Sequence, residues 1–347
     1  MFQTKQIFNK CKSLLVLGLV MLLNMNSKLF AQPTQLGTQT VNGAYVSYPL
    51  TDLGIFRQAR VQATSSALSG TRNWEFYEAP FDYDPAWRPY TGGLTLAGYN
   101  MNIFPTAGTA AALFNTGFGG SAGLMPTIAN GYYYTFNVTE YSTPGVPQNE
   151  YMGVVETSYD PVVITSVVQS PAAGAVYPEN SVYVTVTTAA IPSPGENVFV
   201  RYSTSVNFLT SSLLEVTMVG NTGIVEIPCA GASTTIYYYA YTSNRTGTAI
   251  LTDVGVTGQR AHDMSTLNVN NNAGPNYSYT VLPSIGFCGD YYVPSVCYPT
   301  INSFVNALNS GSVSCDVVCY VATGHSETAP VGGINLTQTG TAANTIT

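Results

Sequence analysis

Lysine is missing from most of this chain. The four lysines, Lys5, Lys10, Lys12 and Lys28, lie at its N-terminal end, and Asp, Glu, Lys and Arg together make up only 8% of the 347 residues. The chain after residue 31 keeps seven scattered arginines against 18 acidic residues, a net charge of −11. Because binding to nucleic-acid phosphates relies on clustered lysine and arginine, we expect no nucleic-acid partner.

Histidine and phosphate-binding glycine motifs are also scarce. The two histidines, His262 and His325, make a Ser-His-Asp triad or a multi-histidine metal site within one domain hard to assemble, which argues against most hydrolases. We expect both to be solvated loop residues. No GxGxxG or P-loop pattern joins a strand to a helix, so nucleotide binding is disfavoured.

Long apolar runs are absent after the N-terminal region. Residues 14–23 form a run of about ten apolar residues, whereas a membrane-spanning helix needs about twenty. Three lysines precede this run and Ala31 follows it, an arrangement typical of a secretory signal peptide. We therefore predict a signal peptide over residues 1–31 with cleavage near Ala31, and a secreted or surface-attached mature chain without a membrane span.

Short strands separated by turn-forming residues are predicted through residues 32–283. Residues 32–160 lack sustained helical spacing and favour a β-sandwich. Residues 161–283 contain seven candidate strands, at 162–168, 182–188, 198–203, 213–219, 224–227, 235–242 and 277–282. Strands 182–188 and 235–242 alternate with period 2, which indicates one buried face each. About seven short strands in about 120 residues favour an immunoglobulin-like or fibronectin type III-like sandwich.

Residues 284–347 follow a different pattern. Ile301, Phe304, Val305 and Leu308 have the spacing of an amphipathic helix, with Thr300 as N-cap and Gly311 past the end. Residues 313–321 then predict a strand whose odd positions are all apolar.

Five cysteines remain after removal of the signal peptide: Cys229, Cys288, Cys297, Cys315 and Cys319. In an oxidising compartment we expect two bridges among the last four, with Cys229 buried and free or paired to another chain. Four residues of extended strand span about 13 Å, too far for a Cys315–Cys319 bridge, so their partners would be Cys288 and Cys297. A zinc site is the alternative, but the spacing contains no CxxC.

Four segments carry a resemblance to a known class of domain. ITSVVQSP at 164–171, SVYVTVT at 181–187, YYYAY at 237–241 and NYSYTV at 276–281 resemble the Ig-like or fibronectin-like modules of large secreted proteins from Bacteroidota-type bacteria. The resemblance covers about a third of the chain and implies a spacer or adhesive module.

The helix, strand, glycine-bearing turn and second strand of residues 284–347 resemble the cap and first coil of a right-handed parallel β-helix, as in pectate-lyase-like proteins. Because such a solenoid needs about three coils, we expect the chain to be a fragment of a longer protein. The predicted fold is therefore all-β, with sandwich modules at 32–160 and 161–283 followed by the capping helix and first coil of a parallel β-helix at 284–347.

Aromatic and charged residues gather between residues 74 and 90. The candidate ligand-binding residues there are Trp74, Asp82, Asp84, Trp87, Arg88 and Tyr90. Aromatic rings can stack on sugar faces, and carboxylates can accept hydrogen bonds from hydroxyls or coordinate calcium, although two carboxylates alone supply too few of its six to eight oxygens. A plain surface loop and a pair of glycosidase carboxylates are the alternatives.

These observations lead to two hypotheses. The first is a secreted or cell-surface, non-catalytic binding or adhesion protein, whose partner is an extracellular glycan or a surface protein, with no catalytic residue and no cofactor other than, at most, calcium. The alternative is the N-terminal portion of a β-helical polysaccharide lyase or hydrolase whose catalytic coils are missing from this chain.

Overall fold

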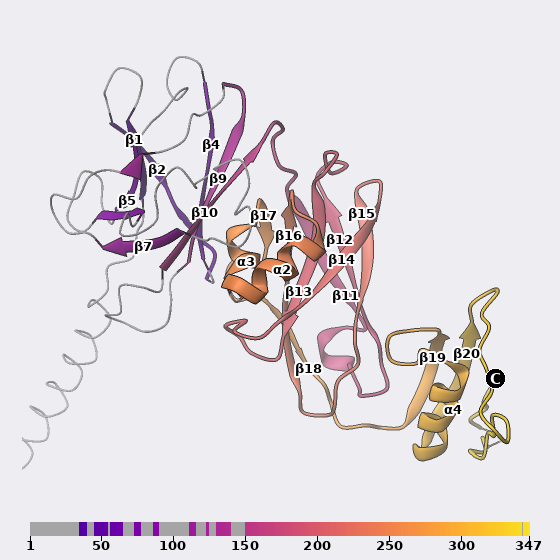
Figure 1. Cartoon of the computed structure of the whole chain (residues 1–347). Helices are drawn as coiled ribbons and strands as arrows, with labels where there is room; N and C mark the ends of the chain where they lie inside the picture. The colour runs from indigo at the N-terminus through magenta and orange to yellow at the C-terminus, as the bar shows by residue number, and fades with distance from the viewer. Residues whose placement is uncertain are drawn as a thin grey trace, which may run out of the picture.

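A computed structural model of the chain describes residues 35–39, 45–54, 56–64, 73–77, 86–89, 111–115, 123–124, 130–139, 150–257, 259–341 and 343–347. These residues form mostly strands in three sheets with few helices, so the all-β prediction is confirmed (Figure 1). The predicted signal peptide and the candidates Asp82, Asp84 and Tyr90 lie outside the described residues.

The first sheet contains ten strands in the described part of the chain. They are β1 (Gln35–Gln39), β2 (Tyr45–Pro49), β3 (Thr51–Asp52), β4 (Arg57–Gln62), β5 (Asn73–Tyr77), β6 (Ala86–Pro89), β7 (Ala111–Asn115), β8 (Gly123–Leu124), β9 (Tyr133–Thr139) and β10 (Glu150–Thr157). Their order is β2-β1-β5-β6-β7-β10-β9-β4-β3, with β8 paired to β5. Strand β9 lies between β10 and β4, and both of its faces are buried from Tyr134 to Val138.

The second sheet comprises β11 (Ile164–Ser170), β12 (Val182–Thr188), β13 (Asn197–Ser203), β14 (Ser212–Val219), β15 (Thr222–Ile227), β16 (Thr235–Ser243), β17 (Asn268–Asn270) and β18 (Tyr277–Thr280). The order is β11-β12-β15-β14-β13-β16-β17, with β18 paired to β16, and the neighbouring strands of this sheet pair antiparallel throughout its described residues. A short 3₁₀ turn, η2 (Ala173–Ala175), precedes β12. The alternation expected for 182–188 is present, because Val182, Val184 and Val186 are buried in a core shared with β13 and β16.

Strand β16 differs from its prediction, because both of its faces are buried. Tyr238 packs in the valine-rich core, while Tyr239 and Tyr241 pack in a second cluster with Phe199 and Ile250. Two helices that the sequence analysis did not predict, α2 (Gly247–Thr257) and α3 (Arg260–Met264), are inserted between β16 and β17. The second cluster includes one residue from each helix, so the helices cover the face that would otherwise be exposed.

Helix α3 and the segment after it also contact the first sheet, as Figure 1 shows. Asn137 on β9 donates from Nδ2 to the carbonyl oxygens of Met264 (3.0 Å) and Thr266 (2.8 Å). Met264 and Leu267 pack in one buried cluster with Val155 of β10. These contacts explain why the polar side of β9 is buried: its amide satisfies carbonyl groups at the end of α3.

His262, expected as a solvated residue, is instead fully buried in α3. Its Nδ1 lies 3.1 Å from the Tyr241 hydroxyl, and within the described part of the chain its Nε2 has no hydrogen-bond partner. Burial, reinforced by the nearby Arg201 cation, lowers the pKa of His262 well below its usual value. The imidazole is therefore neutral in the folded protein.

This burial predicts a pH-dependent stability. The unfolded chain protonates His262 near pH 6.5, whereas the folded chain resists protonation, so the unfolded state binds more protons as pH falls through about 6.5. We expect the free energy of unfolding to decrease from about pH 7.5 to pH 5.5, and His262→Gln to flatten this decrease. Urea titrations at several pH values measure it, with His325→Gln as control. The same pH dependence in wild type and His262→Gln would contradict the prediction.

The third sheet is small and parallel. Strands β19 (Phe287–Val293) and β20 (Val313–Val321) pair in parallel, and α4 (Ile301–Ser310) connects them. The helix prediction is confirmed, since Thr300 forms the N-cap with Ser303 and Gly311 is the C-cap. The strand 313–321 is also confirmed, with Val317 fully buried in its centre.

One of the two expected disulfides is present and the other is absent. Cys288 on β19 is bonded to Cys315 on β20, one of the pairings that the sequence left open once a Cys315–Cys319 bridge was excluded. Cys297 and Cys319 are free thiols, and Cys229, expected to be either buried and free or paired to another chain, is exposed. The second bridge fails because Cys297 lies in the loop before α4, where it faces Cys229 instead of β20.

Candidate functional site

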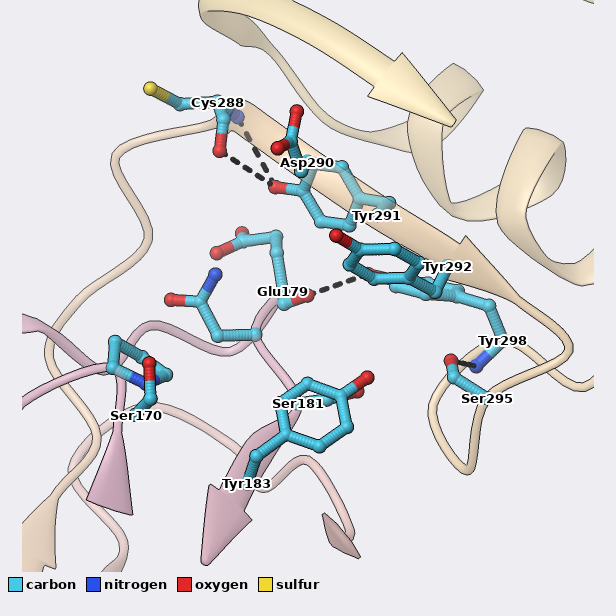
Figure 2. A pocket seen from close by; sticks show the side chains of 12 residues that line it. Ser170, Glu179, Ser181, Tyr183, Cys288, Asp290, Tyr291, Tyr292, Ser295 and Tyr298 are labelled. Carbon is cyan, nitrogen blue, oxygen red and sulfur yellow. Dashed lines mark hydrogen bonds between the residues drawn. The ribbon is translucent and has the colours of Figure 1, made fainter. Parts of the chain in front are cut away.

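A cavity of about 360 Å³ lies between the second sheet and the β19-α4-β20 unit (Figure 2). We refer to it as the junction cleft. Its lining residues are Ser170, Pro171, Glu179, Asn180, Ser181, Tyr183, Cys288, Asp290, Tyr291, Tyr292, Ser295 and Tyr298. They come from the end of β11, the approach to β12 and its first residues, strand β19, and the loop that precedes α4.

Hydrogen bonds between the two units hold the walls of the junction cleft in place. The Tyr298 hydroxyl donates to the Glu179 carbonyl oxygen (3.2 Å), and the Val296 amide donates to Glu226 Oε1 on β15 (3.1 Å). The Ser284 hydroxyl in the connecting segment donates to Glu179 Oε1. Glu179 is thus held through its carbonyl oxygen by Tyr298 of the β19-α4-β20 unit and through its carboxylate by Ser284 of the connecting segment.

Two carboxylates give the junction cleft its electrostatic character. Figure 2 shows Glu179, in the segment before β12, pointing toward Cys288 and Asp290 of β19. Glu179 Oε2 is buried and has no hydrogen-bond partner in the described part of the chain. A buried acceptor without a partner is costly, and a ligand hydroxyl or amine could supply the missing donor. No lysine, arginine or histidine is among the described lining residues, so the site is unsuited to an anion.

Tyrosine rings form much of the remaining wall. Tyr291 and Tyr298 are buried, and burial raises the pKa of both phenols, so they stay neutral hydrogen-bonding groups. Tyr292 is about half exposed and stacks on Tyr320 of the neighbouring strand, with ring centroids 5.3 Å apart and planes at 21°. The pairing of Tyr292 with Tyr320 in the parallel register produces this stack and holds the Tyr292 ring in a fixed orientation.

No metal centre is evident in the described residues, where no three His, Cys, Asp or Glu side chains come together in a way that could hold an ion. His325 is not a solvated turn residue, because its Nε2 lies 2.9 Å from Glu327 Oε2 and both side chains are largely buried. Glu327 in turn accepts hydrogen bonds from the amides of Ile301 and Asn302 at the start of α4. This pair therefore caps a helix.

The candidates from the sequence lie in another part of the fold. Trp74 is on β5, and Trp87 and Arg88 are on the neighbouring strand β6, where Trp87 pairs with Phe76 and Arg88 with Phe114 of β7. The structure thus places these three residues on adjacent strands of the first sheet. Asp82, Asp84 and Tyr90 fall outside the described residues, so their participation stays a prediction.

The junction cleft was missed by the sequence analysis. The sequence feature that could have indicated this site is Asp290-Tyr-Tyr292, a carboxylate followed by two aromatic residues, with Tyr298 six residues later. Glu179 precedes this segment by more than a hundred residues, and no spacing rule connects them.

Comparison with known proteins gives no assignment: no protein-family model matches the chain, and no curated protein matches it at a significant level. Among the described residues, no helix has the length and apolar character needed to cross a membrane.

Proposed function

We propose that the chain is a secreted or cell-surface, non-catalytic binding protein, and that the junction cleft binds an uncharged, hydroxyl-rich ligand of the extracellular glycan type. The observation that carries this proposal is the composition of the cleft: tyrosine rings beside a carboxylate with an unpaired oxygen, and no cationic side chain among the described lining residues. The export signal predicted at the N-terminus supports an extracellular location.

A glycan fits this chemistry in two ways. Sugar hydroxyls donate hydrogen bonds to carboxylates and serine oxygens, while the C–H face of the ring packs on an aromatic side chain. The cavity volume of about 360 Å³ lies toward the lower end of the range of about 300–1,000 Å³ for small-molecule sites. A short stretch of a neutral saccharide would match the size and the polarity of the cleft.

The architecture supports a modular extracellular protein. The seven strands predicted in residues 161–283 all occur and pair antiparallel around a valine-rich core, and this supports the proposal of an immunoglobulin-like sandwich. We infer an Ig-like or fibronectin-like module there and a sandwich in residues 32–160. In this arrangement the Ig-like module presents one wall of the binding cleft.

One observation favours the alternative function. Strand β20 pairs in parallel with β19 on one side, and Val317 of β20 forms a parallel bridge to Ile346 on the other. Successive parallel strands with stacked tyrosines are what a right-handed β-helix would produce. The second candidate is therefore a β-helical polysaccharide lyase or hydrolase whose catalytic coils lie outside this chain, with the cleft as an accessory binding site.

A retention assay tests the first candidate. The full chain is passed over immobilised neutral polysaccharides, and its retention is compared with that of Tyr292→Ala and Asp290→Asn. Because aromatic contacts contribute about 0.5–1.5 kcal/mol, we expect Tyr292→Ala to weaken retention about twofold to tenfold. Tyr132→Ala, which removes an exposed tyrosine directly before β9, is the matched control and should bind like wild type.

The same assay separates the two candidate sites. Equal retention of Trp87→Ala and wild type would exclude the ligand site predicted around residues 74–90. If Tyr292→Ala and Asp290→Asn both keep full retention while Trp87→Ala loses it, the junction cleft is not the ligand site.

A further inference from the structure

Cys229 and Cys297 lie against each other at the boundary between the second sheet and the β19-α4-β20 unit. Cys229 follows the end of β15, and Cys297 lies in the loop between β19 and α4. The backbone amide of Cys229 donates a hydrogen bond to the Cys297 sulfur at 3.1 Å, although the two residues are 68 positions apart. Two cysteines from separate units thus meet at contact distance.

The contact is fixed by its neighbours on both sides of Cys297. The Val296 amide donates to Glu226 Oε1, and the Tyr298 hydroxyl donates to the Glu179 carbonyl oxygen. Three consecutive residues therefore attach the loop that carries Cys297 to β15, to the residues after β15 and to the segment before β12. Cys229 is exposed to solvent, and Cys297 is partly buried, so an oxidant can reach the first thiol.

We propose that Cys229 and Cys297 form a disulfide that joins the second sheet to the β19-α4-β20 unit beside the junction cleft. With Cys288–Cys315 already bonded, this second bridge leaves Cys319 as the unpaired cysteine of residues 32–347. The inference does not depend on the proposed glycan ligand, because it follows from the geometry of the two cysteines alone.

The chemistry requires an oxidant, which we take to be a disulfide, either of a low-molecular-weight thiol or of a disulfide-exchange protein. A hydrogen bond from the Cys297 thiol lowers the pKa of Cys229 to about 7, so a large part of Cys229 is thiolate at neutral pH. The thiolate attacks one sulfur of the oxidant, forms a mixed disulfide and expels one thiol. Cys297 then loses its proton and attacks the Cys229 sulfur, which expels the second thiol. Two cysteine thiols lose two electrons and two protons, and the oxidant disulfide takes them up as two thiols.

The arginine positions make this bridge easy to detect. Complete tryptic cleavage places Cys229 in peptide 202–245 and the other four cysteines after the signal region in peptide 261–347, because no lysine or arginine follows Arg260. Any disulfide of Cys229 within residues 32–347 therefore links these two peptides, whereas Cys288–Cys315 lies within one of them. The full chain is reduced, reoxidised with glutathione disulfide, blocked with an alkylating reagent, digested without reduction and examined by mass spectrometry.

We expect a linked 202–245/261–347 species in most of the wild-type chain. Cys297→Ser should abolish the link, while Cys319→Ser, the matched control, should keep it. Two results would overturn the proposal: a wild-type digest in which peptide 202–245 carries only alkylated Cys229 although Cys288–Cys315 has formed, or a link of equal yield in Cys297→Ser. Circular dichroism of each variant confirms that it is folded before digestion.

Discussion

Replacing Asp263 with alanine is expected to lower the free energy of unfolding by about 3–5 kcal/mol, the range typical of breaking a buried ion pair from one side. Arg201 on β13 contacts Asp263 of α3 at 2.7 Å, and the two side chains are only 1% and 4% exposed. Removal of the carboxylate leaves a guanidinium ion without its counterion in a buried site. The cost is therefore dominated by the charge that remains.

The other contacts of Arg201 cannot compensate for this loss. Its guanidinium donates to the hydroxyls of Tyr239 (2.7 Å) and Ser211 (2.7 Å) and to the Phe208 carbonyl oxygen (3.0 Å). These partners are neutral dipoles, so they orient the cation but do not neutralise it. The double variant Arg201→Met/Asp263→Ala removes both charges and should be less destabilised than Asp263→Ala alone.

Hydrogen exchange of the β13 and β16 amides under increasing urea measures these decreases in the free energy of unfolding within the second sheet. Asp160→Ala is the control, because Asp160 has an exposed carboxylate 3.6 Å from Arg60, and pairs with an exposed partner contribute about 0–1 kcal/mol. An equal decrease in the free energy of unfolding in Asp160→Ala and Asp263→Ala would show that burial does not determine the strength of the Arg201–Asp263 pair.

Local sequence patterns predicted an element correctly where its structure depends only on its own residues. The alternating valines of β12 and the capped, amphipathic α4 were predicted correctly because periodicity and capping are local properties. Helix α2 was not predicted, since its sequence GTAILTDVGVT is rich in threonine, valine and glycine, which are weak helix formers. Its Ile250 is fully buried against the tyrosine face of β16, so tertiary packing stabilises what propensity does not.

The features that were not predicted from the sequence depend on contacts between residues far apart in the chain. The burial of His262, the Cys229–Cys297 contact and the junction cleft each depend on how separate elements pack together. The predicted bridge between Cys297 and β20 assumed that the cysteines of residues 288–319 pair among themselves. That assumption omitted the end of β15, which lies closer to Cys297 in space than the sequence suggests.

Loss of the Cys288–Cys315 bridge is expected to destabilise the β19-α4-β20 unit by about 3–4 kcal/mol, the entropic effect of closing a loop of this size. The bridge joins residues 27 positions apart and encloses α4. The core of the unit is small; its buried members in the described residues are Phe287, Tyr291, Val293, Tyr298, Phe304, Leu308 and Val317. A core of this size depends strongly on such a covalent link.

The double variant Cys288→Ser/Cys315→Ser tests this dependence without leaving a single cysteine free to exchange with Cys297 or Cys319. We expect amide exchange in α4 and β20 to accelerate roughly several-hundredfold, as 3–4 kcal/mol requires, while β12 and β13 keep their protection. Cys319→Ser, which removes a free thiol from the same strand, should change exchange by less than about tenfold. Unchanged exchange in the double variant would mean that the aromatic core alone holds the unit together. In that case the wall of the junction cleft formed by Tyr291 and Tyr298 would be stabilised by packing and not by the bridge.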